Sequence, residues 1–143
     1  MHIELIAREI VDSSIKVHRA LGPGLFESVY QQCLSLELHN RGLGVESEVI
    51  LPIVYDGVRI ESGYRLDMLV EKTIVIENKS VEKILPIHEA QILTYLRLGG
   101  FPMGFLLNWK TILMKNGIRR FVGLAMGPIT SSTRVKIKTE GIK

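Results

Sequence analysis

The feature that most constrains the fold is a pair of strand-like stretches separated by a short polar turn. Residues 63–70 and 73–79 are rich in β-branched and apolar side chains. This pattern predicts two antiparallel strands joined by a tight loop. If residues 71–73 form a three-residue loop, Val70 pairs with Ile74.

The same register places two carboxylates opposite each other, Asp67 and Glu77. Directly opposed cross-strand residues have Cβ atoms roughly 4.5–5.5 Å apart, and like charges there are destabilising. A bound cation would offset that repulsion. Hard cations such as Mg²⁺ or Mn²⁺ prefer oxygen ligands, so the pattern predicts a divalent-metal site, with the backbone carbonyl of Asn78 as a third oxygen.

Lys79 follows Glu77 by two residues, so the alternation of a strand sends both side chains to one face. Its ammonium group would orient or help to deprotonate an attacking water and stabilise charge that develops on phosphorus. The alternative is an ordinary surface ion pair between Lys79 and Asp67 or Glu77. Such a pair contributes only about 0–1 kcal/mol.

Periodicity predicts the remaining elements. The expected helices and strands are helices over residues 3–21, about 25–42 and 86–98, and strands over 46–55, 58–70, 73–78, 104–109 and, more weakly, 119–126. The dipeptide Asp56-Gly57 predicts a hairpin between the first two strands. The side chains that we expect the second helix to bury are Phe26, Val29, Tyr30, Cys33 and Leu36. This order predicts an α/β (α+β mixed) fold, a single domain with a mixed β-sheet flanked by helices.

Two helices carry polar side chains beside apolar ones. Glu27 and Tyr30 share a face of the second helix, and His88, Gln91 and Tyr95 form a stripe on the third. Each also has a structural explanation, as a core histidine with a partner, a solvated glutamine or a packing tyrosine. The two faces meet the hairpin acids only if both helices cover the same end of the sheet.

Composition limits the protein class. The chain of 143 residues has a net charge of +3, and four basic side chains against one acidic side chain give residues 131–143 that same net charge. We expect one domain over residues 1–130 and a basic tail over 131–143, which is either a solvated terminus or a contact for phosphates. A single cysteine, Cys33, excludes an internal disulfide. Neither a membrane span nor a leader pattern is found, so we expect a cytoplasmic protein.

Several segments resemble one protein family. Residues 17–30 closely resemble the GxxExxY family, whose naming motif corresponds to Gly24, Glu27 and Tyr30. Further agreement lies in residues 63–67, 76–79, 87–91, 94–96 and 106–109, so the likeness covers about residues 3–125. That family is similar to the PD-(D/E)XK nuclease superfamily. The resemblance implies a restriction-endonuclease-like αβββαβ core.

The resemblance also implies roles for individual residues. Asp67 corresponds to the first acid, and residues 77–79 correspond to the (D/E)XK element. Gln91 and Tyr95 match a QxxxY motif beside the active site, and Glu27 resembles the helix-borne acid that completes the metal site. The middle residue of the (D/E)XK element is usually apolar in this family. Here it is Asn78, whose amide needs partners on the face opposite Glu77.

These observations predict a Mg²⁺- or Mn²⁺-dependent nuclease, or nuclease-like phosphodiesterase, that hydrolyses DNA phosphodiester bonds. The expected catalytic residues are Asp67, Glu77, Lys79 and Glu27. The expected metal ligands are Asp67, Glu77, Glu27 and Asn78. The expected substrate-positioning residues are Gln91, Tyr95, Tyr30 and His88. Two alternatives remain: a nuclease-derived module that binds nucleic acid without cleaving it, and an interaction module that forms a homodimer through sheet edges and apolar surface.

Overall fold

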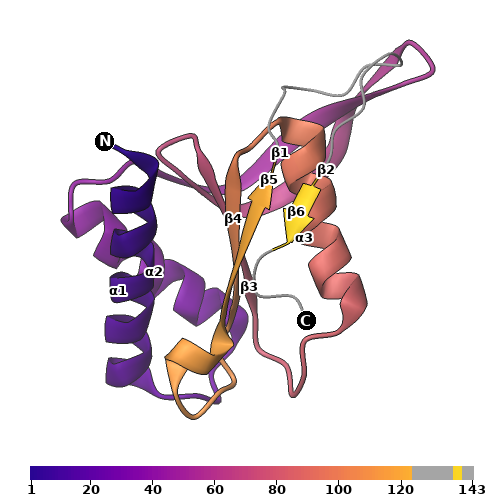
Figure 1. The fold of residues 1–143 in the computed structure, drawn as a ribbon. Coiled ribbons are helices and arrows are strands. Elements are labelled where there is room, and N and C mark those ends of the chain that lie inside the picture. The colour runs from indigo at the N-terminus through magenta and orange to yellow at the C-terminus, as the bar shows by residue number, and fades with distance from the viewer. Residues whose placement is uncertain (124–136, 140–143) are drawn as a thin grey trace.

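The predicted helices and strands occur in the predicted order in the computed structural model, which describes residues 1–123 and 137–139 and adds a short 3₁₀-helix and a last strand, β6, within the predicted tail (Figure 1). The elements are α1 (Ile3–Leu21), α2 (Glu27–Asn40), β1 (Val45–Tyr55), β2 (Val58–Val70), β3 (Ile74–Lys79), α3 (Pro86–Gly99), β4 (Met103–Asn108), the 3₁₀-helix η1 (Met114–Gly117), β5 (Ile118–Gly123) and β6 (Ile137–Thr139). The weak strand expected over residues 119–126 is β5. Its last three expected residues, the predicted boundary at residue 130 and most of the predicted basic tail lie outside the described residues.

The strands in the described part of the chain form one sheet in the order β1-β2-β3-β4-β5-β6. Neighbouring strands are antiparallel except β3 and β4, which are parallel and are connected through α3. Helices α1 and α2 lie on one side of the sheet and α3 lies on the other (Figure 1). The mixed sheet flanked by helices, with the predicted αβββαβ order at its centre, is confirmed.

Each face of the sheet contributes to its own hydrophobic core. The core under α1 and α2 includes Ile10, Leu34, Ile76, Phe105 and Trp109. The core under α3 includes Leu69, Val75, Ile92, Leu106 and Phe121. Successive residues of β3 and β4 therefore point into different cores, as the two-residue period of a strand requires. Both strands are buried on both faces, which explains why they read as continuous apolar runs.

The turn between β2 and β3 has the predicted length. Val70 pairs with Ile74, and Thr73 N–H donates to the Val70 carbonyl over 3.0 Å. Glu71 and Lys72 both adopt positive φ, 51° and 53°. The loop thus fixes the register on which the position of the acidic residues depends.

The predicted buried face of α2 was partly wrong. The buried side chains of α2 are Tyr30, Leu34 and Leu38, four residues apart. Phe26 is 82% exposed and Leu36 is 61% exposed. Phe26 precedes the helix, where its backbone is extended, and Leu36 lies about 200° around the helix from Leu34 at 100° per residue.

Tyr30 connects α2 to the glycine-rich turn that follows α1. Its hydroxyl donates to the Gly22 carbonyl over 2.5 Å and accepts from Leu25 N–H over 3.1 Å. Its ring stacks on Trp109, with centroids 4.8 Å apart and an interplanar angle of 6°. Gly22 ends α1 with φ 71°, a conformation that favours glycine. Tyr30 therefore holds the entrance to α2 against the end of β4.

No helix among residues 1–123 and 137–139 is long and apolar enough to cross a membrane.

We predict that Tyr30→Phe lowers the free energy of unfolding by about 1–3 kcal/mol, because two backbone groups lose their buried partner. Urea denaturation would measure this change. The matched control is Tyr55→Phe, since Tyr55 is 73% exposed and should change stability by less than about 0.5 kcal/mol. Equal stability of the two variants would contradict this role for the Tyr30 hydroxyl.

Candidate active site

The backbone ladder between β2 and β3 ends at the acidic residues. The last paired residues are Met68 and Ile76, and one step further in the same register Asp67 faces Glu77. Here side chains replace backbone partners: Asp67 N–H donates to Glu77 Oε2 over 2.9 Å, and Asn78 N–H donates to Asp67 Oδ2 over 2.8 Å. Each carboxylate is thus held by the other strand's backbone.

Burial and mutual repulsion both favour the protonated form of these acids. Glu77 is only 3% exposed, and its burial, followed by the charge of Asp67, raises its pKa to about 8. Burial also raises the pKa of Asp67, although the N–H group of Asn78 and the charge of Lys79 oppose the change. The two carboxylates titrate as a pair. A cation placed between them would reverse this preference and favour both charged forms.

Lys79 lies beside the pair without forming an ion pair. Its Nζ donates to Gln91 Oε1 over 3.4 Å, and within residues 1–123 no carboxylate lies within 4.0 Å of its ammonium group. Its charge nevertheless lowers the pKa of both Asp67 and Glu77. The surface ion pair that was the alternative interpretation is therefore not formed.

Helix α3 brings Gln91 and Tyr95 to the same place. The Tyr95 ring stacks on Tyr64 of β2, with centroids 5.0 Å apart. Burial and then the charges of Glu77 and Asp67 raise the pKa of Tyr95, while a hydrogen bond with Gln91 lowers it. The predicted convergence of the α3 stripe on the hairpin acids is thus found for these two residues.

Glu27 does not complete a three-carboxylate metal site. Its Oε1 accepts from Ser80 N–H over 3.0 Å, and the described residues contain no group of three acidic, histidine or cysteine side chains that could hold one ion. Glu27 and Asp67 line one cavity of about 520 Å³, and the charge of Glu27 contributes to the raised pKa of Asp67. The N-terminus of α2 packs against the end of β3, and the Glu27 carboxylate pairs with that backbone. A ligand role for Glu27 therefore stays a prediction.

Comparison with protein families agrees with this geometry. Residues 4–121 match the family model described as the PD-(D/E)XK nuclease superfamily. The chain belongs to the PD-(D/E)XK nuclease superfamily. Searches of curated proteins and of solved structures gave no match. Membership indicates a nuclease-like protein with nucleic acid as its class of substrate, in a superfamily that typically depends on divalent metal.

One acid beside the PD-(D/E)XK hairpin was missed by sequence reasoning. Glu48 of β1 falls opposite Asp67, between the pairs Ser47–Met68 and Val49–Leu66. It has φ 54°, and its charge raises the pKa of both Asp67 and Glu77. Its own carboxylate pairs with Arg65 over 3.2 Å.

An irregularity in the β1–β2 hairpin explains why this acid was missed. The turn at Asp56-Gly57 pairs Tyr55 with Val58, and that register alone would place residue 46 opposite Asp67. The register shifts between Leu51 and Ile53, next to a proline that cannot donate to a ladder. The shift moves the partner of Asp67 by two positions. Only a bulge signal at residue 52 could have indicated it.

Asn78, the middle residue of the segment that resembles a (D/E)XK element, has a partner for each polar atom of its side chain. Its Oδ1 accepts from Trp109 Nε1 over 2.9 Å, and its Nδ2 donates to Gln31 Oε1 over 3.3 Å and contacts Met68 Sδ at 3.4 Å. The side chain is 1% exposed, on the face opposite Glu77. The partners predicted for this amide are therefore present, and they come from α2, β2 and the end of β4.

Two predicted positioning residues lie away from the acids. Tyr30 is fully buried and its hydroxyl bonds the turn before α2. His88 Nδ1 accepts from Leu85 N–H over 2.9 Å and so caps the start of α3. The hydrogen bonds of Tyr30 and His88 are with backbone groups near the starts of α2 and α3, and their positioning role stays a prediction. Their positions at helix starts account for their conformations.

We predict that the stability difference between wild type and Glu77→Gln depends on pH. The pKa of Glu77 is raised on folding from 4.5 to about 8, so its protonated form stabilises the fold below pH 4.5 and that contribution is lost as the pH rises toward 8. The glutamine of the variant stays neutral throughout. Without metal, urea denaturation should show wild type losing stability relative to the variant over this pH window, on the order of a few kcal/mol. A difference that is constant with pH would contradict the raised pKa.

We predict energetic coupling between Asn78 and Trp109. Asn78→Leu leaves the indole N–H without its partner, which costs about 1–3 kcal/mol, and Trp109→Phe removes the donor. In a double-mutant cycle, the double variant should lose at least about 0.5 kcal/mol less than the two single losses together. Denaturation of all four proteins measures this, and simple additivity would show that the bond contributes nothing.

Proposed function

We propose that this protein is a Mg²⁺- or Mn²⁺-dependent nuclease that hydrolyses phosphodiester bonds in DNA. The observation that carries the proposal is the pair Asp67 and Glu77, held in opposition by backbone N–H groups with the Lys79 ammonium beside them. Superfamily membership supports the reaction class. The resemblance of residues 17–30 to the GxxExxY family supports the same assignment.

The donor set fits a hard divalent cation. Asp67 and Glu77 supply carboxylate oxygens, which Mg²⁺ and Mn²⁺ prefer. Each uses one oxygen to accept from a peptide N–H, which leaves the other oxygen for a ligand. Burial raises the pKa of both carboxylates, and the charge of Asp67 raises that of Glu77 further; a bound cation would favour their charged forms. We therefore propose these two residues as the protein's metal ligands, with water and a phosphate oxygen completing the shell and the Asn78 carbonyl as a further candidate. When bound, the cation acts as a Lewis acid toward the phosphodiester.

The other side chains act on water and phosphate. Lys79 would donate to the attacking water or to a non-bridging phosphate oxygen, where negative charge grows in the transition state. Gln91 holds the ammonium group through its Oε1 and thereby limits the positions that Lys79 adopts. Tyr95, stacked on Tyr64, would form the wall against which the phosphate backbone lies. Glu27 acts through the Ser80 backbone, as a positioning residue for the end of β3.

We predict that Asp67→Asn and Lys79→Met each reduce the rate of DNA cleavage by about 100-fold or more. The assay uses linear, circular and single-stranded DNA with Mg²⁺ or Mn²⁺. The matched controls are Asp56→Asn and Lys72→Met, which make the same chemical changes in the two hairpin turns, and they should retain wild-type rates. Cleavage that survives both site substitutions would indicate a contaminating nuclease and reject the assignment.

Metal binding is measured separately from cleavage. Calorimetric titration of Mn²⁺ into wild type should show a site that Glu77→Gln lacks.

DNA binding with a steep salt dependence but without cleavage by any variant would support the alternative of a module that binds nucleic acid without cleaving it. A dimer by light scattering together with no DNA binding at low salt would support the interaction module.

A further inference from the structure

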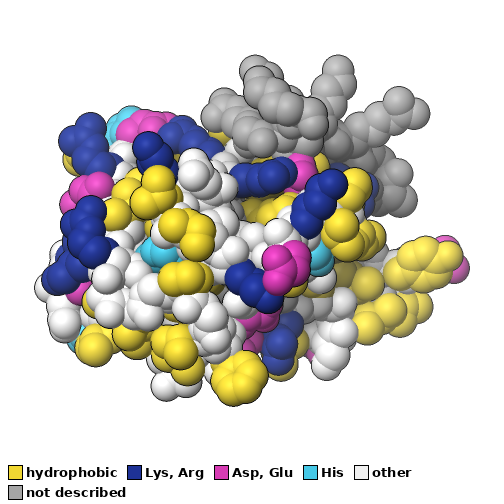
Figure 2. Space-filling model, turned by 90° about the horizontal axis from the view of Figure 1, so that it is seen from below, with side chains coloured by type: hydrophobic (Ala, Val, Ile, Leu, Met, Phe, Trp, Pro, Cys, Tyr) yellow, Lys and Arg dark blue, Asp and Glu magenta, His cyan; other side chains and the backbone are white. Residues whose placement is uncertain are grey.

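A second cavity lies where α1 ends, outside the proposed metal site. It measures about 520 Å³, opens to solvent and is lined by the last turns of α1, the turn at Gly22-Pro23 and the segment of residues 112–115. This volume is within the range of roughly 300–1,000 Å³ that is typical of small-molecule sites. In the view from below, hydrophobic side chains gather at this end of the molecule among lysine and arginine side chains (Figure 2).

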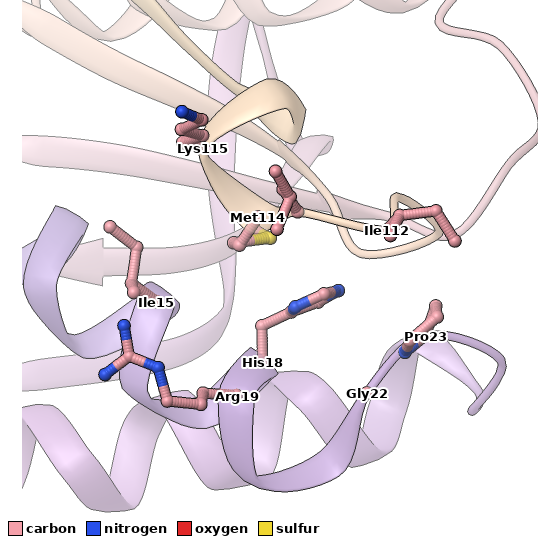
Figure 3. Close-up of a pocket in the computed structure, with 9 residues that line it drawn as sticks. Ile15, His18, Arg19, Gly22, Pro23, Ile112, Met114 and Lys115 are labelled. Carbon is pink, nitrogen blue, oxygen red and sulfur yellow. The ribbon is translucent and has the colours of Figure 1, made fainter.

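The lining separates into an apolar part and a cationic part (Figure 3). Arg19 and Lys115 lie on one side of the cavity with Ile15 between them, and Ile112 and Pro23 lie on the other side. Within residues 1–123, neither cation has an ion-pair partner.

The walls of the cavity are fixed by contacts that do not involve a ligand. His18 Nε2 lies 2.8 Å from the Thr111 carbonyl and so ties α1 to the segment after β4. Gly117 packs so closely that a Cβ there would lie 2.1 Å from the Asn108 carbonyl oxygen. This close packing holds η1, and with it the buried Met114, against the end of β4. The cavity is therefore preformed, which limits the ordering cost of binding.

Exposed apolar surface continues the cavity outward. Ile112 is 84% exposed and Leu113 is 54% exposed, and both side chains line the cavity. Two adjacent large apolar side chains at the mouth of a pocket indicate a binding surface more strongly than scattered ones do.

We propose that this cavity binds a small amphipathic anion, an aliphatic chain or aromatic ring that carries one carboxylate or sulfonate. The apolar body lies against Ile112, Pro23 and Met114. The acid group faces Arg19 and Lys115, where charge complementarity fixes its orientation. This site is separate from the proposed nuclease chemistry and does not depend on it.

Binding in the cavity can be followed by tryptophan fluorescence. His18, which lines the cavity, stacks on Trp109 with ring centroids 6.4 Å apart. Trp109 is the only tryptophan in the 143-residue chain, and its indole N–H donates to Asn78. A ligand that contacts His18 therefore changes the surroundings of a single fluorophore.

The test uses 8-anilinonaphthalene-1-sulfonate, an aromatic sulfonate whose fluorescence rises in apolar surroundings. We predict saturable binding of one molecule per chain. The double variant Arg19→Gln/Lys115→Gln should weaken it by about tenfold, and Ile112→Glu should weaken it by placing a carboxylate, which repels the sulfonate, at the mouth of the cavity. The matched control is Arg59→Gln/Lys72→Gln, which removes the same net charge far from the cavity and should bind as wild type does.

Competition identifies the ligand chemistry. Decanoate, an aliphatic carboxylate, and 4-phenylbutyrate, an aromatic one, compete with the probe. The one that binds more tightly shows whether the cavity prefers an aliphatic chain or an aromatic ring. Decanoate also changes the emission of Trp109, whereas neutral decanol competes at least about tenfold less well. Three results would each overturn the proposal: absence of saturable binding, equal binding by the two double variants, or equal competition by decanol and decanoate.

Discussion

The exchange of hydrogen bonds between β2 and β3 is the interaction on which the site depends. Where the regular ladder would continue past Met68 and Ile76, the Asp67 and Asn78 peptide N–H groups turn to carboxylate oxygens instead. These two N–H groups keep hydrogen-bond partners, because the carboxylates accept from them. The cost falls on the carboxylates, which are brought together in a buried place. Burial raises the pKa values of both carboxylates, and repulsion from Asp67 raises that of Glu77 further. A bound cation would offset this free-energy cost.

The support for this hairpin is distributed over both faces of the sheet. On the α3 face, Lys79 donates to Gln91. On the opposite face, the Asn78 amide connects Trp109 to Gln31. A polar residue at the middle position of the (D/E)XK element is tolerated because every polar atom of its side chain has a partner. The segment that carries Glu77 is consequently held from both faces.

Trp109 links this support to the end of α1. Its ring stacks with both Tyr30 and His18, and its N–H donates to Asn78. Trp109 therefore contacts residues of the glycine-rich motif, of the proposed anion cavity and of the segment that carries Glu77. The Tyr30 of the GxxExxY-like motif contributes here through packing and through its bonds to the turn. The tyrosine of this motif thus has a structural role in this chain, while its glutamate contacts the end of β3.

The sequence by itself determined α1 to α3 and β1 to β5, their order, the β2–β3 register and the opposition of Asp67 and Glu77, but not η1 or β6. These features depend on residue periodicity and on turns of two or three residues, which fix neighbouring strands within a short range. The sequence placed Gln91 and Tyr95 on one face of α3, because they lie one helical turn apart, but only the docking of α3 on the sheet brought that face to the acids.

Only the tertiary structure decided where Glu27, Glu48 and Phe26 lie. The position of Glu27 depends on how α2 docks against the sheet, and that of Glu48 depends on a register shift near residue 52. Phe26 is exposed because the helix begins after it. Each of these outcomes results from packing between segments that are distant in the sequence or from a local irregularity, and a repeating pattern of apolar residues encodes neither.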